Sequence, residues 1–347
     1  MIGFGPPRRA CPQERAMLCS IIDTLADGCR RRGTSRPLRT IKRWLVAVGL
    51  MTLTPSLSWA CACGCGVFEV GTASLFPSGS GGTVFLEYNF MDQYANWHEA
   101  HKAPATANDD KVLRTQFFTL GVQYMFNRSW GFVATVPYDD RYFKTENDDG
   151  TGTNAFEHSA LGDIRIEGMY TGFSEDMSTG VRFGVKLASG DFTYPNFDRD
   201  TSIGSGSTDL LLGGYHLGSL PFSLKGRSFN WFANALWDVP MWTQQEYRPG
   251  KEIDLAVGAL YNYGRLGVFD QVTPIVNLVG TDRLRDHGAN ADPDNSGYDR
   301  LVIGPGAEVR VGVVRLYSGI NFPIYQNVVG NQVTTPFYVT FIASYDF

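Results

Sequence analysis

The chain lacks the features of several common protein classes. After residue 60 it has no apolar run of about 18 residues, so the sequence predicts no transmembrane helix there. An excess of basic residues, which nucleic-acid binding requires, is also missing. Residues 1–60 hold 10 of the 30 basic and 3 of the 35 acidic residues, which leaves 20 and 32 in the remainder. That remainder carries a net charge of about −12, and we therefore expect no nucleic-acid partner.

A catalytic pattern is missing as well. The five histidines are His98, His101, His158, His216 and His287. None of them has a serine and a carboxylate at a spacing that suggests a catalytic triad. All but His216 fall in segments that we expect to be loops. The sequence therefore predicts that the protein is not an enzyme.

The final strand, residues 337–347, shows most clearly what the chain does contain. One set of alternate positions is apolar and aromatic, and the other set is mostly polar. Successive side chains of a strand point to opposite faces, so one whole face is apolar. In a membrane β-barrel that face meets lipid while the polar face lines the lumen. The competing interpretation is an ordinary amphipathic edge strand of a soluble sheet.

The end of this strand carries a second signal. Phe347 is the carboxy-terminal residue, and Tyr345 precedes it by two positions. This ending resembles the closing strand of bacterial outer-membrane barrels, which their assembly machinery reads. We therefore predict that Tyr345 and Phe347 form an assembly signal and that the barrel-assembly machinery is a partner.

Alternating segments recur along the chain and predict an all-β fold. The 39 Gly, 23 Phe, 16 Tyr and 7 Trp residues suit a β-barrel. We expect a transmembrane antiparallel barrel of about twelve strands, closed by the C-terminal strand. The expected strands are residues 83–91, 118–126, 130–138, 163–170, 181–187, 208–217, 229–237, 253–263, 272–278, 300–310, 313–324 and 337–347.

The gaps between these strands alternate in length, which is the strongest sequence signal. The expected short gaps are 127–129, 172–178, 218–227, 264–270 and 311–312. The expected long gaps are 95–111, 139–157, 190–206, 239–250, 281–298 and 326–334. Bacterial barrels have short periplasmic turns and longer outer loops. We therefore expect both termini in the periplasm, and lipid and lipopolysaccharide around the barrel in the outer membrane of a Gram-negative bacterium.

The amino-terminal part has a different character. Residues 1–60 read as a leader with a signal peptide, in which Lys42 and Arg43 precede a short apolar run. Its first 35 or so residues suggest a mis-called start, although a long basic n-region is an alternative. Residues 61–80 form an expected Cys-rich periplasmic segment, and residues 81–347 form the barrel.

Cys61, Cys63 and Cys65 follow the expected cleavage site directly. Three thiols at alternate positions suit a soft metal ion. A disulfide competes, because the periplasm is oxidising, and lipidation of Cys61 is a third alternative. If the cluster functions, it would recruit a periplasmic metal or redox partner.

The middle of the chain resembles a known family. Residues 159–166, Ser-Ala-Leu-Gly-Asp-Ile-Arg-Ile, resemble its Gly-Leu-Gly-Asp strand start, and residues 185–192, Val-Lys-Leu-Ala-Ser-Gly-Asp-Phe, resemble its Lys-Leu-Pro-Thr-Gly-Asp segment. Residues 203–209 and 118–137 fit two further elements. The family comprises outer-membrane transporters labelled "MetA-pathway of phenol degradation". The resemblance implies a channel without catalytic residues, and the label suggests a hydrophobic or aromatic solute.

Charged residues on the polar faces are expected to line the lumen. They are Glu87, Asp163, Arg165, Glu167, Arg182, Lys186, Glu308, Arg310 and Arg315. For the hairpin around residues 172–178 we predict a register that sets Glu167 opposite Arg182 and Asp163 opposite Lys186. The alternative register sets Arg165 opposite Lys186, and like charges face to face are destabilising.

Two functions follow as hypotheses. The first is an outer-membrane channel or transporter for a small solute. The second is a non-conducting structural or docking barrel whose Cys-x-Cys-x-Cys segment recruits a periplasmic partner.

Overall fold

The computed structural model describes residues 76–77, 79–147 and 150–347. The predicted leader and the predicted metal ligands Cys61, Cys63 and Cys65 lie outside these residues. Within the described part of the chain, no helix is long and apolar enough to cross a membrane.

The described chain is built almost entirely of β-strands. In chain order the elements are β1 (Gly81–Gln93), β2 (Ala95–His98), β3 (His101–Lys102), the 3₁₀ helix η2 (Ala105–Ala107), β4 (Asp110–Met125), β5 (Trp130–Glu146), β6 (Thr153–Leu161), β7 (Arg165–Tyr170), β8 (Thr179–Lys186), β9 (Ser207–Leu224), β10 (Arg227–Thr243), β11 (Glu252–Tyr261), β12 (Gly264–Leu266), β13 (Phe269–Arg283), β14 (Tyr298–Val311), β15 (Val314–Val328), β16 (Asn331–Thr334) and β17 (Tyr338–Asp346).

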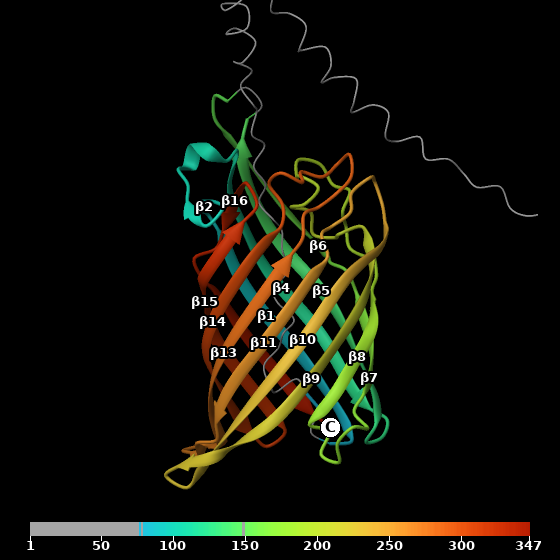
Figure 1. The fold of residues 1–347 in the computed structure, drawn as a ribbon, viewed down its shortest axis with the longest axis vertical. Helices are drawn as coiled ribbons and strands as arrows, with labels where there is room; N and C mark the ends of the chain where they lie inside the picture. Colours follow the sequence, from blue (N-terminus) through green and yellow to red (C-terminus); the bar gives the residue numbers. More distant parts are fainter. Residues whose placement is uncertain (1–75, 78, 148–149) are drawn as a thin grey trace, which may run out of the picture. The chain divides into compact units, whose positions relative to one another are not determined.

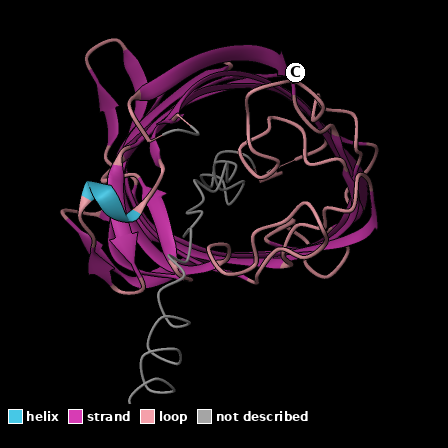
Figure 2. Cartoon of the chain, turned by 90° about the horizontal axis from the view of Figure 1, so that it is seen from above, coloured by secondary structure: helices cyan, strands magenta, loops and turns pink. Residues whose placement is uncertain are grey.

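Twelve of these strands close into one antiparallel barrel (Figures 1 and 2). Their order is β1, β4, β5, β7, β8, β9, β10, β11, β13, β14, β15 and β17, after which β17 returns to β1. The closing pair runs from Thr83 opposite Asp346 to Met91 opposite Tyr338. The prediction of a twelve-stranded barrel closed by the C-terminal strand is therefore confirmed.

The connections differ in length at the two ends of the barrel. The end with the β4–β5, β7–β8, β9–β10, β11–β13 and β14–β15 connections is called the turn end, and the opposite end is called the loop end. The β9–β10 connection is tighter than the predicted gap 218–227, because both strands extend to Lys225 and Gly226. These two residues have φ angles of 54° and 75°, which suit a two-residue hairpin turn of the primed type.

Several predicted loops at the loop end also contain strands. The predicted gap 139–157 is largely a β5–β6 hairpin, and β2, β3 and β16 form a small separate sheet within the gaps 95–111 and 326–334. The alternation of short and long connections predicted the sheet correctly. It placed the strand ends too early, because hydrogen-bonded pairing continues where the apolar alternation stops.

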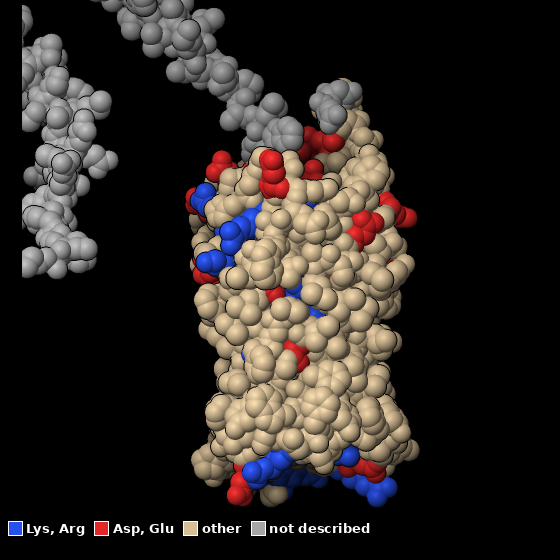
Figure 3. All heavy atoms as spheres, turned by 90° about the vertical axis from the view of Figure 1, so that its right-hand side faces the viewer, with Lys and Arg blue, Asp and Glu red and all other residues tan. Residues whose placement is uncertain are grey.

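The two faces of the strands are occupied as predicted. Outward side chains on the barrel wall are large, apolar and exposed, among them Leu86, Leu120, Ile166, Val181, Phe183, Val185, Leu255, Val257, Val276, Ile320 and Phe341. Inward neighbours such as Asn89, Thr340 and Ser344 are buried. In Figure 3 a band in the lower half of the wall is almost free of charged atoms, and Lys, Arg, Asp and Glu gather below it at the turn end and over the upper part of the molecule.

Aromatic rings gather outside the barrel near the turn end. Phe126 stacks on Phe132 with ring centroids 5.6 Å apart, and Trp130 contacts Tyr170 at 4.8 Å. The ring of Phe347 stacks on Tyr124 at 6.2 Å. Such rings favour the headgroup level of a bilayer, and membrane barrels carry them as girdles, so this cluster is typical of a barrel in lipid.

The closing seam, formed by β15, β17 and β1, is held by short polar contacts on its lumen side. Thr340 donates to Asn89 Oδ1 at 2.6 Å and accepts from Asn321 at 3.2 Å. Asp346 accepts from Thr83 at 2.8 Å and pairs with Arg315 at 2.7 Å. These contacts satisfy buried polar groups across all three strands.

Candidate functional site

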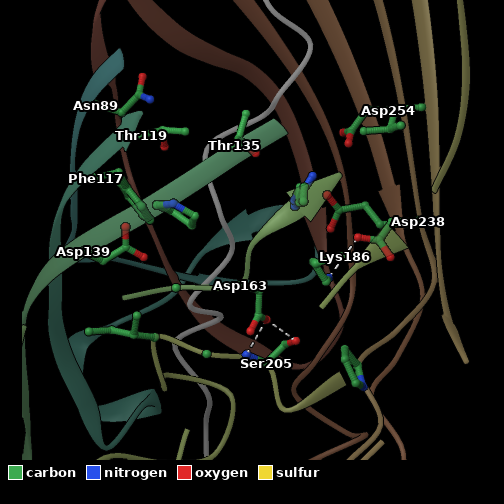
Figure 4. A pocket seen from close by; sticks show the side chains of 18 of the residues that line it. Asn89, Phe117, Thr119, Thr135, Asp139, Asp163, Lys186, Ser205, Asp238 and Asp254 are labelled. Atoms are coloured by element: carbon green, nitrogen blue, oxygen red, sulfur yellow. Dashed lines mark hydrogen bonds and ion pairs between the residues drawn. The ribbon is translucent and has the colours of Figure 1, made fainter. Parts of the chain in front are cut away.

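The lumen contains a cavity of about 250 Å³ that reaches from the loops of the loop end toward the middle of the barrel. Its lining mixes charge with apolar side chains. The charged lining residues are Glu87, Asp139, Arg141, Asp163, Arg165, Glu167, Arg182, Lys186, Arg199, Asp200, Asp238, Glu252, Asp254 and Arg283. The apolar lining includes Phe76, Phe85, Phe117, Val133, Met169 and Leu236. Figure 4 shows Lys186 reaching toward Asp238 on one side, with Asn89 and Thr119 on another.

One row of charges crosses six neighbouring strands. Strand pairing places these lumen-facing residues nearly level, and we call them the charged belt: Arg165, Lys186, Asp209, Asp238, Glu252 and Arg283. Lys186 pairs with both Asp209 and Asp238, the latter at 2.9 Å. Arg283 pairs with Glu252 at 3.6 Å. The belt thus contains two groups of partly buried ion pairs, one around Lys186 and one at Arg283.

The predicted register of the β7–β8 hairpin is wrong. The structure sets Arg165 opposite Lys186 and Glu167 opposite Gly184, which is the register that we expected like charges to exclude. Lys186 tolerates Arg165 because Asp209 and Asp238 neutralise it from the two strands beyond. A prediction from one hairpin could not include these counter-charges.

One expected ion pair survives the change of register. Glu167 still contacts Arg182, diagonally, with Oε2 3.6 Å from Nε. Asp163 does not pair with Lys186. The barrel strand is interrupted at residues 162–164, and Asp163 turns to accept from the backbone N–H groups of Gly190 at 2.9 Å and Ser205 at 2.8 Å.

By these two hydrogen bonds Asp163 holds the β8–β9 loop, residues 187–206, against the lumen wall. Arg141 of β5 is buried and holds the same loop by donating to the carbonyl oxygens of Thr201 at 2.6 Å and Ser202 at 3.0 Å. The loop therefore contributes Arg199, Asp200 and residues 202–205 to the cavity lining.

The turn-end side of the cavity is apolar. Phe76, which precedes β1, stacks on Tyr215 with ring centroids 4.6 Å apart and contacts Phe232 at 5.9 Å. These rings belong to a buried cluster that includes Met125, Met169 and other inward side chains. Phe76 thus occupies part of the lumen on the turn-end side of the charged belt.

Asp200 of the β8–β9 loop is an acidic group whose pKa is shifted by its surroundings. Its pKa is raised to about 7, mainly by burial and then by the nearby carboxylate of Asp286, while Arg283 acts in the opposite direction. Tyr247 donates to Asp286 at 2.8 Å, and burial raises the pKa of that tyrosine as well. The β8–β9 loop therefore meets two other loop-end segments through buried acidic groups.

The structure brings most of the predicted lumen residues together. Glu87, Asp163, Arg165, Glu167, Arg182 and Lys186 line the cavity. Glu308, Arg310 and Arg315 lie instead near the β14–β15 turn, outside the cavity lining, and Arg310 is exposed. Tyr345 and Phe347 lie on the outer face, and their role as an assembly signal stays a prediction.

Sequence reasoning missed several charged residues of the site. Asp238, Glu252 and Arg283 fell one to five positions outside the predicted strands, and Asp139 and Arg141 fell in a predicted loop. Continuing the alternation past the last apolar residue would have placed Asp238 and Arg283 inward. Asp209 was missed because the expected strand 208–217 shows no clear alternation of apolar and polar residues, so its inward face could not be assigned.

Metal binding has no support from the described residues. His98 and His101 face each other in a β2–β3 hairpin. Among the described residues, no group of three or more His, Cys, Asp or Glu is placed to hold a metal ion. The soft-metal site at Cys61, Cys63 and Cys65 stays a prediction.

Comparison with known proteins supports the fold. No protein-family model matches the chain, and no curated protein sequence matches it. Its structure is similar to an outer membrane channel from Pseudomonas putida F1, with a TM-score of 0.58 and 12% identity, covering 80% of this chain and 100% of that one. More distant are the CymD monoaromatic hydrocarbon channel and a FadL homologue from Pseudomonas aeruginosa. CymD has a TM-score of 0.38 at 9% identity, covering 81% of this chain and 94% of its own. The FadL homologue has a TM-score of 0.38 at 11% identity, covering 77% and 90%.

These likenesses have different weight. The channel from Pseudomonas putida F1 shares the overall arrangement of strands, whereas the other two are too dissimilar to support any inference. The chain therefore has the fold of outer-membrane β-barrels. Its resemblance to the MetA-pathway family stays a prediction.

Proposed function

We propose that the chain is an outer-membrane channel that passes a small solute through its lumen. One observation carries this proposal: a closed barrel with an apolar outer wall surrounds a polar, charged cavity. Such a barrel needs lipid outside and water or solute inside. The likeness to an outer membrane channel from Pseudomonas putida F1 agrees with it.

The proposed location is the outer membrane of a Gram-negative bacterium. In barrels of this kind the short turns face the periplasm, so the turn end and both ends of the barrel chain would be periplasmic. Lipid and lipopolysaccharide would surround the wall, and the barrel-assembly machinery would insert it. The proposal assigns no reaction to the lumen.

The solute must be small. The cavity of about 250 Å³ falls below the roughly 300–1,000 Å³ that is common for sites of drug-sized ligands. The sequence resemblance favours a hydrophobic or aromatic solute, and the apolar lining near Phe76 suits such a body. Because the cavity lining is also charged, the solute should carry a polar group as well.

A conductance measurement tests the proposal. Purified protein in a planar bilayer should give discrete steps, and liposomes that contain it should swell in small polar solutes. A barrel that inserts fully but gives neither steps nor swelling would reject the channel and favour the docking hypothesis. Heat-modifiable migration on gels serves as the control for correct folding in each preparation.

A further inference from the structure

Two buried polar side chains on the cavity wall have hydrogen-bonding groups without partners. Neither amide atom of Asn234, which is 4% exposed, has a hydrogen-bond partner. Arg182, whose side chain is 10% exposed, leaves Nε and one terminal nitrogen without a hydrogen bond. A buried polar group without a partner costs about 1–3 kcal/mol, so these positions favour a ligand that supplies one.

Strand pairing places the two side chains on the same lumen face, on β8 and β10, with β9 between them. Arg182 lies level with Gly213 and Leu236 on the next two strands, and Asn234 follows on the same face two residues from Leu236. Gly213 of β9 puts no side chain between them. A Cβ there would lie 2.7 Å from the carbonyl oxygen of Ala235, 3.3 Å from Leu236 Cδ1 and 3.7 Å from Arg182 Nε.

Apart from Glu167, which contacts Arg182, the paired neighbours of the two side chains are apolar or aromatic. Met169 is opposite Arg182 on β7, and Tyr215 is opposite Asn234 on β9. Tyr215 carries the stacked ring of Phe76, and Met169 and Phe76 line the same cavity. A ligand that reached Arg182 and Asn234 would therefore place its remaining atoms against apolar side chains.

The chemistry of the free groups selects an anion. Arg182 offers two N–H donors of fixed geometry, which match a carboxylate, and the amide nitrogen of Asn234 can donate a third. Lys186, a cation of the charged belt on the same strand, has two carboxylates of its own, whereas Arg182 contacts one at 3.6 Å. Arg182 is thus the cation of this wall with the greater capacity for an added anion.

We propose that Arg182 and Asn234 bind the carboxylate of a small monocarboxylic acid whose apolar body packs against Met169, Leu236 and Phe76. We build this site on the proposed channel function, since it names the class of solute that the lumen would hold. The carboxylate would accept from Arg182 and Asn234 and would compete with Glu167 for the guanidinium group.

The test uses benzoate as the probe at neutral pH, where it is anionic, and benzyl alcohol as its neutral counterpart. Calorimetry on the purified full barrel in detergent measures both affinities. We expect benzoate to bind at least about tenfold more tightly, as a charge-assisted hydrogen bond worth about 1.5–3 kcal/mol requires. Equal binding of the two probes would overturn the proposal.

Variants then locate the site. Arg182→Gln should weaken benzoate binding about tenfold or more, and Asn234→Leu about fivefold, in line with the loss of one or two hydrogen bonds. Glu167→Gln should strengthen it, because it removes the competing carboxylate. Asn277→Leu is the matched control: Asn277 also has a buried carbonyl oxygen without a partner, but it does not line the cavity.

Each outcome bears on the proposal separately. If Arg182→Gln does not fold, the benzoate affinities of Asn234→Leu and Glu167→Gln test the site instead. An Asn234→Leu protein that binds benzoate as tightly as Asn277→Leu does would reject the site. Conductance without benzoate binding would reject the site and leave the channel intact. Benzoate binding without conductance would reject the channel and leave the site.

Discussion

The charged belt and the closing seam solve the same problem in different ways. Both must satisfy polar side chains inside a barrel. The belt uses stacked ion pairs around Lys186 on the wall from β7 to β13, whereas the seam uses mainly hydroxyl and amide contacts around Thr340, with Arg315–Asp346 as its ion pair.

The difference has an energetic consequence. A buried ion pair is weak evidence of net stability. Removal of one partner, however, leaves the other charge buried without a partner, at a cost of several kcal/mol. A neutral contact is cheaper to lose. Substitution of one charged residue in the belt should therefore cost much free energy of unfolding. Substitution of one neutral residue in the seam should cost less. The following predictions test this contrast.

The largest effect is expected at the centre of the belt. Lys186→Met removes the cation shared by Asp209 and Asp238 and should lower the free energy of unfolding by about 3–5 kcal/mol. Urea unfolding in detergent micelles measures it. Adding Asp209→Asn and Asp238→Asn should recover most of the loss. A loss below about 1 kcal/mol would show that the belt is solvated rather than buried.

Loss of the last residue of the seam, Phe347, should affect assembly of the barrel. Deletion of Phe347 should lower recovery in the outer membrane more than it lowers the stability of the protein that does insert. Gly82→Ala is the matched control, because its Cβ would lie 2.4 Å from the Phe347 ring while the terminal residue remains. Equal assembly defects in both variants would assign Phe347 a packing role and not a recognition role.

A smaller effect is expected in the middle of the seam. Thr340→Val keeps the shape of the side chain but leaves Asn89 and Asn321 each short of one hydrogen bond. The free energy of unfolding should fall by about 1–3 kcal/mol, less than for Lys186→Met. The same urea measurement applies. A loss equal to that of Lys186→Met would remove the contrast between the two regions.

Ion selectivity should depend on Arg182 more than on charges near the β14–β15 turn. Arg182→Gln removes a cation from the cavity wall and should shift the reversal potential toward cation selectivity in a salt gradient. Arg310→Gln, at an exposed position outside the cavity lining, is the comparison and should shift it less. Equal shifts in both variants would mean that the cavity wall does not set selectivity.

The smallest effect concerns the β8–β9 loop and pH. Burial raises the pKa of Asp200 from 3.8 to about 7, so the folded protein holds this proton more tightly than the unfolded chain. The resulting stability is complete at pH values below about 4 and is lost as the pH rises through about 7. Limited proteolysis of the loop should therefore be faster at pH 8 than at pH 5. Asp200→Asn should remove this dependence on pH. If the variant keeps the dependence, a titratable group other than Asp200 causes it.

Much of the barrel was predictable because its signals are local. Alternation of apolar and polar side chains depends only on the pleat of each strand, so the twelve strands and their outward faces, including Leu86, Ile166 and Phe341, followed from the sequence. Connection length also lies in the chain itself. The strand ends were less accurate, since β5, β9 and β10 continue by pairing with neighbours after their apolar pattern fades.

The tertiary structure alone decided how the lumen charges combine. From the sequence, Glu167, Arg182 and Lys186 were known to face inward, but the partners of Lys186 come from β9 and β10. The inward turn of Asp163 depends on Gly190 and Ser205, which lie 27 and 42 residues away. An ion pair in a barrel wall depends on several strands at once, because each side chain faces a shared interior. The sequence determines which face a residue occupies, and the closed barrel determines which charge it meets there.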